Sequence, residues 1–149
     1  MTAAAVSLDR AVPADLDAVV KLLIDASLPL DGASEAIVRA GVVAREDGAI
    51  IGAAALELYG EAALLRSVVV AADHRGTGLG HAVVAAAEAL ARDEGVRDLY
   101  LLTETAIDWF PRLGYAPVER AVAAAAVGES IEFTTVCRDK GVPMVRRLG

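Results

Sequence analysis

The chain has little cysteine, no long apolar run and no excess of positive charge, and each absence excludes a class of protein. A single cysteine, Cys137, in 149 residues excludes an internal disulfide framework and fits a reducing compartment. No stretch approaches the roughly 20 apolar residues that a membrane span needs. The net charge of −7 argues against nucleic acid as a partner, because that affinity rests on Lys and Arg neutralising phosphates.

The first residues also lack the pattern of a secretory signal. Asp9 and Arg10 interrupt the apolar residues early, and no basic segment precedes a long apolar core. We therefore expect a cytoplasmic protein without a membrane partner. With 56% apolar and 23% charged residues, the chain is expected to fold as one globular domain over residues 1–149. The oligomeric state stays open, a homodimer included.

The most informative segment is a glycine-rich stretch directly after a β-branched run. Residues 64–71 are typical of a strand, Gly76, Gly78 and Gly80 predict a tight turn, and an apolar-periodic helix follows. Glycines let a backbone pass close to a ligand, and a helix N-terminus carries partial positive charge. Arg75 adds a full charge beside them. This junction predicts a site for an anionic ligand that carries phosphate.

The glycine spacing decides between known phosphate motifs. A dinucleotide fingerprint, G-x-G-x-x-G, would need a glycine at His81. A P-loop would need Gly-Lys-Ser/Thr, but Gly80 is followed by His81 and Ala82. The residues instead spell Arg75-x-x-Gly78-x-Gly80, which resembles the pyrophosphate motif of GNAT N-acetyltransferases. A glycine-rich turn that binds nothing is the alternative.

The predicted elements alternate between strands and helices. Strands are expected at 3–8, 41–45, 50–59, 62–71, 98–103 and 144–147, with one more after Gly114-Tyr115, and helices from Pro13, at 34–39, after the glycines and at 106–113. Asp47-Gly48 and Gly60-Glu61 are expected to be tight turns. This order is similar to the GNAT fold, which implies an α/β class with a mixed, mostly antiparallel sheet flanked by helices. In that fold the parallel strands 64–71 and 98–103 splay apart and form the CoA slot.

A second family mark follows further along the chain. Trp109-Phe110-Pro111-Arg112-Leu113-Gly114-Tyr115 resembles the family signature aromatic–Tyr–x–x–Leu–Gly–aromatic. Family members often use the tyrosine to protonate the departing thiolate. Here Phe110 stands in its place and cannot donate a proton, which leaves the general acid in doubt. Tyr59, Thr103 and a water molecule are the alternatives.

A narrower resemblance concerns enzymes associated with bacterial arsenic-resistance operons. It rests on Ala63-Leu64-Leu65-Arg66-Ser67, Leu101-Leu102-Thr103-Glu104-Thr105 and Glu132-Phe133-Thr134-Thr135-Val136-Cys137. The resemblance implies detoxification by N-acetylation without identifying a substrate. Cys137 could bind trivalent arsenic, but one thiol makes a poor site, and an idle or buried cysteine is the alternative. No metal is expected.

The family resemblance implies acetyl-CoA as cosubstrate, held by the strand and the glycine loop. The residues expected to bind it are Val68, Val69, Val70, Arg75, Gly76, Thr77, Gly78, Leu79, Gly80, Thr103 and Phe110. The backbone N–H near Val70 is the expected donor to the developing oxyanion, because its neighbouring strand has peeled away. His74 is a candidate phosphate contact, whereas His81 is expected to be exposed.

Glu57 is the expected catalytic base for the acceptor amine. Leu56 and Leu58 flank it, so alternation points Glu57 away from the face that the leucines bury. A two-residue turn at Gly60-Glu61 makes Glu57 and Arg66 diagonal neighbours on one face. We expect this face to line the acceptor pocket, with Arg66 holding an anionic group. The alternatives are an exposed glutamate and an arginine that only neutralises it.

Two functions from different classes remain open at this point. The first is an N-acetyltransferase that moves acetyl from acetyl-CoA to a small-molecule amine, in arsenic or toxin resistance or in metabolism. The second is a module that senses acyl-CoA or a toxic anion and catalyses little, a reading that Phe110 favours. Thiol release with a panel of amines separates the two.

Overall fold

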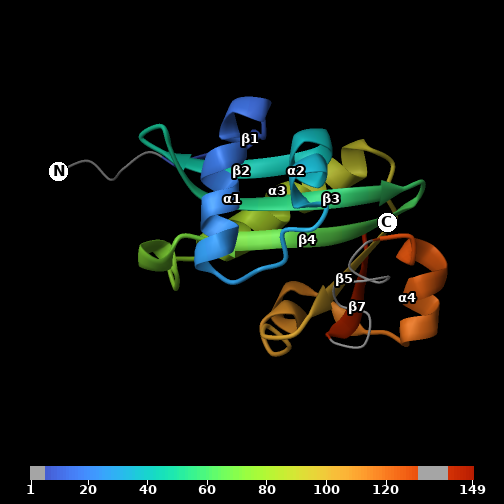
Figure 1. Cartoon of the computed structure of the whole chain (residues 1–149). Coiled ribbons are helices and arrows are strands. Elements are labelled where there is room, and N and C mark those ends of the chain that lie inside the picture. Colours follow the sequence, from blue (N-terminus) through green and yellow to red (C-terminus); the bar gives the residue numbers. More distant parts are fainter. Residues whose placement is uncertain (1–5, 131–140) are drawn as a thin grey trace. The chain divides into compact units, whose positions relative to one another are not determined.

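Seven strands form a single sheet in the order β1-β2-β3-β4-β5-β7-β6 (Figure 1). This computed structural model describes residues 6–130 and 141–149. The strands are β1 (Val6–Arg10), β2 (Gly41–Glu46), β3 (Ala49–Tyr59), β4 (Ala62–Val70), β5 (Asp98–Thr103), β6 (Ala116–Pro117) and β7 (Val142–Arg147). The helices are α1 (Leu16–Asp25), α2 (Ala33–Ala40), α3 (Leu79–Asp93) and α4 (Arg120–Val127), with short 3-10 helices η1 (Pro13–Asp15), η2 (Ala72–His74) and η3 (Phe110–Leu113).

The strand directions confirm the expected mixed sheet. β1 with β2, β2 with β3, β5 with β7 and β6 with β7 are antiparallel pairs. β4 and β5 are parallel, and their register runs only from Ala62 opposite Asp98 to Leu64 opposite Tyr100. Both strands continue beyond that point, so the parallel pairing covers only the first three residues of each strand.

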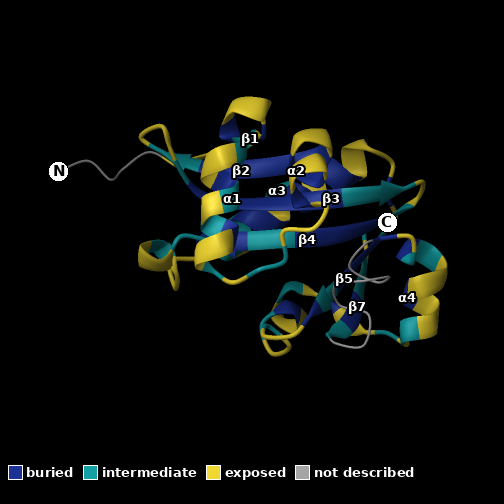
Figure 2. Cartoon of the chain, viewed as in Figure 1, coloured by how far each residue is buried: buried dark blue, intermediate teal, exposed yellow. Residues whose placement is uncertain are grey.

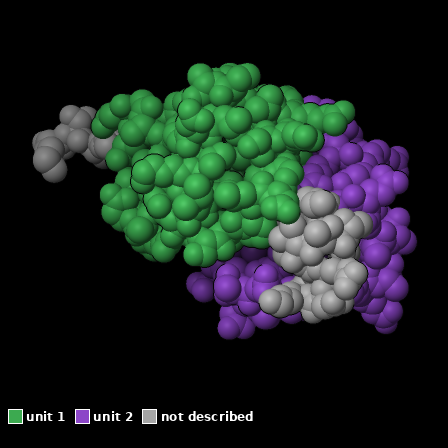
Figure 3. Space-filling model, viewed as in Figure 1, with its two compact units in different colours: residues 1–56, 67–87 green, residues 57–66, 88–149 purple. Residues whose placement is uncertain are grey.

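The chain divides into two compact units, shown in separate colours in Figure 3. The first unit comprises residues 1–56 and 67–87, and the second comprises residues 57–66 and 88–149. The strands β3 and β4 and the helix α3 each contribute residues to both units.

The core of the first unit lies between its helices and strands. α1 and α2 lie on one face of the strands (Figure 1). Val19 and Leu23 of α1 and Ile37 of α2 belong to the apolar faces of these helices and pack into the core. The middle of β3 is buried on both faces (Figure 2), and Ala53–Ala55 have no exposed surface. A side chain at Gly52 would lie 3.2 Å from Val83 of α3, so glycine permits the close approach of that helix.

Two hairpin turns form as their sequences predict. Asp47 and Gly48, between β2 and β3, have φ of 50° and 86°, and two positive φ values are the requirement of a type I′ turn. Gly60, between β3 and β4, has φ of 70°. Both turns span two residues, which fixes the register of each hairpin from its closed end.

β4 contains one residue in the left-handed conformation. Ser67 has φ of 57°, although it is not glycine and lies inside the strand. A constant register from the two-residue turn would place Val70 opposite Ile51, but the Ala71 N–H donates to the Ile51 carbonyl at 2.8 Å. One extra residue on β4 accounts for the shift, and the positive φ identifies Ser67 as the bulge.

The second unit packs α4 against its own strands. Leu64 of β4, Tyr100 of β5 and Ala123 and Val127 of α4 form its main apolar cluster. A buried ionic group lies in the same unit. Glu88, which is 5% exposed, accepts hydrogen bonds from the Tyr115 hydroxyl at 2.8 Å and from the Arg146 guanidinium at 2.8 and 2.9 Å.

Some elements differ from the sequence predictions. The helix expected over 106–113 is only η3, because Pro111 has no N–H and cannot donate the hydrogen bond to the fourth residue before it that a continuous α-helix requires. α4 was not predicted, since its sequence, Arg-Ala-Val-Ala-Ala-Ala-Ala-Val, gives little contrast between an apolar and a polar face. The first described strand is Val6–Arg10, and the start of the range predicted for it, at 3–5, lies outside the described residues.

We expect Asp15→Asn to destabilise the first unit by about 2 kcal/mol at neutral pH. Asp15, 6% exposed, accepts two hydrogen bonds of 2.7 Å from Arg45 and one of 2.9 Å from the Val12 N–H. The hydrogen bonds from Arg45 hold the pKa of Asp15 below its usual value. This stabilisation is present above about pH 4 and is lost as the pH falls through the lowered pKa.

Urea unfolding of both proteins from pH 3 to pH 7 measures this effect. Asp25→Asn is the matched control, because its pair with Lys21 is largely exposed at both ends and should contribute little. A pH-independent difference between the wild type and Asp15→Asn would contradict the assignment.

Candidate functional site

The glycine loop (residues 75–80) connects η2 to α3 and has the backbone that its sequence predicts. Gly76 and Gly78 have φ of 79° and 86°, a conformation that other residues rarely adopt. A Cβ added at either position would meet nothing within 4 Å, so the loop is open above both glycines. The Ala82 N–H donates to the Gly78 carbonyl at 3.2 Å, which begins the hydrogen bonding of α3.

The loop concentrates positive potential without much formal charge. The first N–H groups of a helix have no partner within the helix, and α3 is 15 residues long. Arg75 is exposed at the start of the loop, and the Thr77 hydroxyl donates to the His74 carbonyl at 2.5 Å. Backbone dipoles and one arginine suit a pyrophosphate, even in a chain of net charge −7.

The end of β4 offers backbone donors on one edge. Because the Ala71 N–H points to β3, and N–H groups alternate along a strand, the N–H groups of Val68 and Val70 point to the opposite edge. Pairing with β5 ends at Leu64, well before these residues. Val69 is 4% exposed and packs into the core of the first unit, so it contributes support rather than a free side chain.

His74 lies at the end of η2 with both ring nitrogens next to carboxylates. Nδ1 is 3.0 Å from Asp73 Oδ1, and Nε2 is 3.1 Å from Glu46 Oε1. These contacts, Asp73 first, raise the pKa of His74 above its usual value. The phosphate contact considered for His74 stays a prediction, and His81 is exposed as expected.

In the second unit, Glu57, Tyr59 and Arg66 form a compact polar group, the Glu57 cluster. The Tyr59 hydroxyl donates to Glu57 Oε1 at 2.6 Å, and Arg66 Nη1 donates to Glu57 Oε2 at 2.8 Å. The Arg66 side chain has no exposed surface, and that of Glu57 is 15% exposed. Glu57 and Arg66 therefore meet across the hairpin, as their predicted shared face requires.

The charges of the Glu57 cluster have a clear assignment. Burial, together with the carboxylate of Glu57, raises the pKa of Tyr59, and a hydrogen bond with Ser130 acts in the opposite direction. Tyr59 is therefore a neutral donor at physiological pH. Both Glu57 oxygens accept hydrogen bonds, one from Tyr59 and one from Arg66. The observed ion pair matches the neutralising role left open for Arg66, while the anion-binding role stays a prediction.

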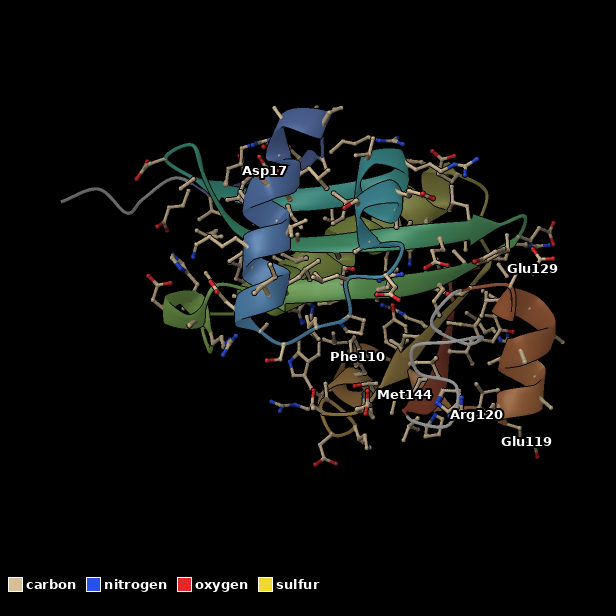
Figure 4. All side chains as sticks on the ribbon, in the orientation of Figure 1. Asp17, Phe110, Glu119, Arg120, Glu129 and Met144 are labelled. Atoms are coloured by element: carbon tan, nitrogen blue, oxygen red, sulfur yellow. The ribbon has the colours of Figure 1, made fainter. Side chains whose placement is uncertain are left out.

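Phe110 and Thr103 also lie in the second unit. Phe110, labelled in Figure 4, is 7% exposed, and its ring makes edge-to-face contacts with Trp109 and Tyr115 at centroid distances of 4.9 and 5.6 Å. Thr103 is 7% exposed, and its Oγ1 accepts the Ala106 N–H at 3.0 Å. Both residues have structural contacts, and a role at the cofactor remains a prediction for each.

The structure thus brings the predicted residues together in two groups. Val68–Val70 and the glycine loop belong to the first unit, whereas Glu57, Arg66, Thr103 and Phe110 belong to the second. Sequence reasoning named Tyr59 only as an alternative general acid and did not place it beside Glu57, although its position two residues after Glu57 places it on the same strand face. It also missed Ser130, for which no signal existed because α4, just before it, was not predicted.

Other candidates contribute less. Among residues 6–130 and 141–149, no group of three or more His, Cys, Asp or Glu side chains is placed to hold a metal ion. Cys137 lies outside the described residues. None of the helices described is both long and apolar enough for a membrane span.

Part of this chain is similar in sequence to known proteins. Residues 39–117 match the family model of the acetyltransferase (GNAT) domain. An uncharacterized N-acetyltransferase of Chlorobaculum tepidum and an amino-acid acetyltransferase of Aeromonas salmonicida are each 35% identical over 79 residues, 52% of this chain. The matched stretch spans 50% of the first relative and 18% of the second.

The fold also has solved relatives. N-acetylglutamate synthase from Neisseria gonorrhoeae, complexed with coenzyme A and N-acetyl-glutamate, has a TM-score of 0.82 at 20% identity. The similarity covers 99% of this chain and 36% of that one. At this identity the comparison shows a shared fold.

Proposed function

Because this chain belongs to the GNAT family of acetyltransferases, we propose that it transfers the acetyl group of acetyl-CoA to the amine of a small molecule. The observation that carries this proposal is the glycine loop, with two glycines at positive φ, exposed Arg75 and the N-terminus of α3 behind them. This arrangement fits a pyrophosphate.

The residues of the first unit divide the work of binding acetyl-CoA. The N–H groups of residues 76–80 and the Arg75 guanidinium hold the pyrophosphate, and the edge of β4 holds the pantetheine arm through Val68. Acetyl-CoA supplies the acetyl thioester. The Val70 N–H points away from β3 and donates to the acetyl carbonyl oxygen as negative charge develops on it.

The Glu57 cluster serves the acceptor. Hydrogen bonds from Arg66 and Tyr59 fix the direction of the Glu57 carboxylate, and its partial exposure leaves it accessible to an ammonium group. Glu57 attracts the ammonium and takes its proton, directly or through water, so that the neutral amine attacks the acetyl carbon. The C–N bond forms, the C–S bond breaks, and the thiolate takes up a proton after it leaves.

We propose an acceptor that carries an anionic group beside its amine, such as an amino acid. We assign Arg66 to that anion, because a guanidinium can bind a carboxylate through two parallel hydrogen bonds. The names of the Aeromonas and Neisseria proteins point to amino-acid acetylation in those enzymes. An arsenical amine is the narrower candidate that the sequence suggests, and a cytoplasmic location fits either acceptor.

A sensing module remains the second candidate because of Phe110. Its ring supplies no hydroxyl to protonate the thiolate, and it packs against Trp109 and Tyr115. A thiol pKa near 8.5 nevertheless makes the CoA thiolate a tolerable leaving group. Thiol release with a panel of amino acids and amine-bearing arsenicals decides between the candidates, because a sensor binds CoA without turnover.

Gly78→Val should reduce CoA affinity by at least about tenfold while the protein stays folded. The variant forces a β-branched residue into φ of 86° and places its side chain over the open loop. Calorimetric titration with CoA measures the loss. Gly95→Val is the control, because Gly95 has φ of 82° and equally open space at the end of α3. Unchanged CoA affinity in a folded Gly78→Val protein would defeat the loop assignment.

Glu57→Gln and Arg66→Ala should fail in different ways. Loss of the base lowers turnover, and the rate recovers as rising pH deprotonates the amine without help. Loss of the anchor mainly raises the KM for an anionic acceptor. Steady-state kinetics from pH 6 to pH 10 separate the two, and Glu61→Gln in the exposed turn of the same hairpin is the control. Equal kinetics for all three variants would remove the acceptor site from this cluster.

Phe110→Tyr tests the missing general acid. If Phe110 lies beside the CoA thiol, the added hydroxyl protonates the leaving thiolate and raises turnover without changing the KM for the acceptor. Turnover and thermal unfolding are measured together, since the position is nearly buried. A folded variant with wild-type turnover across the pH range shows that Phe110 only packs.

A further inference from the structure

The His74 ring is bound at both nitrogens by groups that can only accept hydrogen bonds. Asp73 Oδ1 lies 3.0 Å from Nδ1, and Glu46 Oε1 lies 3.1 Å from Nε2. A neutral imidazole has one N–H and one lone pair, so one of these carboxylates would face a lone pair. The imidazolium form donates to both carboxylates, and it alone satisfies the geometry with both carboxylates ionised.

The charged groups around the ring are few. Asp73 belongs to the same short helix as His74, and Glu46 is the last residue of β2. Arg75 and Asp47 follow them along the chain, and both are exposed. Both acidic partners raise the pKa of His74, in agreement with the geometry. When His74 is protonated, its positive charge offsets one of the two negative charges of the carboxylates. When His74 is neutral, neither negative charge is offset.

This ring stands at the entry of the glycine loop. Glu46 directly precedes the rigid type I′ turn at Asp47-Gly48, so it offers a fixed attachment point in the sheet. The His74 carbonyl accepts the Thr77 hydroxyl from inside the loop. The contacts therefore connect the β2–β3 hairpin, through His74, to the backbone that leads into Gly76 and Gly78.

We propose that His74, as an imidazolium, is a positioning residue for acetyl-CoA. It fixes the start of the glycine loop to β2, and its charge shields the incoming pyrophosphate from Glu46 and Asp73. Deprotonation removes one of the two hydrogen bonds and leaves two uncompensated carboxylates at the loop. CoA affinity then falls as the pH rises through the His74 transition. The proposal rests on the proposed role of the loop in binding the pyrophosphate.

The first experiment uses the fact that the chain has two histidines. A pH titration of their imidazole proton resonances by NMR gives both transitions in one sample, with assignment from His74→Gln and His81→Gln. We expect the His74 transition to lie above the ordinary pKa of a histidine side chain, and Glu46→Gln to lower it. A His74 transition at or below that ordinary pKa would overturn the proposal.

The second experiment measures the Kd of CoA from pH 5.5 to pH 9 for wild type, His74→Gln, Glu46→Gln and His81→Gln. The phosphates of CoA titrate alike in every protein, so the ratio of variant to wild-type Kd isolates the effect of His74. We expect His74→Gln to bind roughly threefold to tenfold more weakly at low pH, with a ratio that approaches one above the His74 transition. His81→Gln should keep a ratio of one throughout.

Two other outcomes have distinct meanings. If Gly78→Val weakens CoA binding but the His74→Gln ratio stays at one or does not change with pH, His74 has no such role and the loop assignment stands. If Gly78→Val also leaves CoA affinity unchanged, the proposed function of the loop fails, and the His74 proposal fails with it.

Discussion

The arrangement of β4 depends on one backbone conformation, the left-handed Ser67. A non-glycine residue in this conformation costs on the order of 1–3 kcal/mol, which the surrounding sheet must offset. The left-handed residue forms a bulge that adds one residue to β4. The bulge shifts by one residue the pairing of the rest of β4 with β3. Residues 62–66 remain in a regular hairpin, whereas Val68 and Val70 direct their N–H groups to an edge that β5 no longer occupies.

Ion pairs organise both units of this acidic chain. Arg45 is bound by Asp15, Arg66 by Glu57 and Arg146 by Glu88, each with at least one nearly buried member. A buried cation with a hydrogen-bonded carboxylate contributes little net charge to the surface. At the glycine loop, aligned backbone dipoles at the start of α3 and exposed Arg75 supply positive potential.

Much of the fold follows from short-range patterns in the sequence. The strand lengths, both hairpin turns and the glycine-rich helix start depend on local alternation and on residues with special φ, such as Gly48 and Gly78. The contact of Glu57 with Arg66 followed from turn length alone. α4 and the brevity of η3 escaped prediction, because an alanine-rich helix has weak periodicity and because Pro111 lacks the N–H that a longer helix would need.

The parts of the site that sequence could not supply depend on tertiary contacts. Nothing local indicates that Glu46 and His74, 28 residues apart, contact each other, or that Ser130 reaches Tyr59. The sequence also gives no sign of the left-handed conformation at Ser67, since serine has no special preference for it. The two contacts and the left-handed residue become visible only in the folded structure, where the strand pairing and the neighbours of each side chain are known.

The aromatic contact of Trp109 with Phe110 makes tryptophan fluorescence a probe of this region. The chain contains one tryptophan, and its ring centroid lies 4.9 Å from that of Phe110. All of the indole emission of the protein therefore comes from Trp109, which lies next to Phe110, the residue predicted to lie beside the CoA thiol. Quenching or a spectral shift of the Trp109 fluorescence on adding a ligand would report binding near Phe110 without any label. A substitution at Phe110 would itself change this fluorescence, because the two rings are in contact.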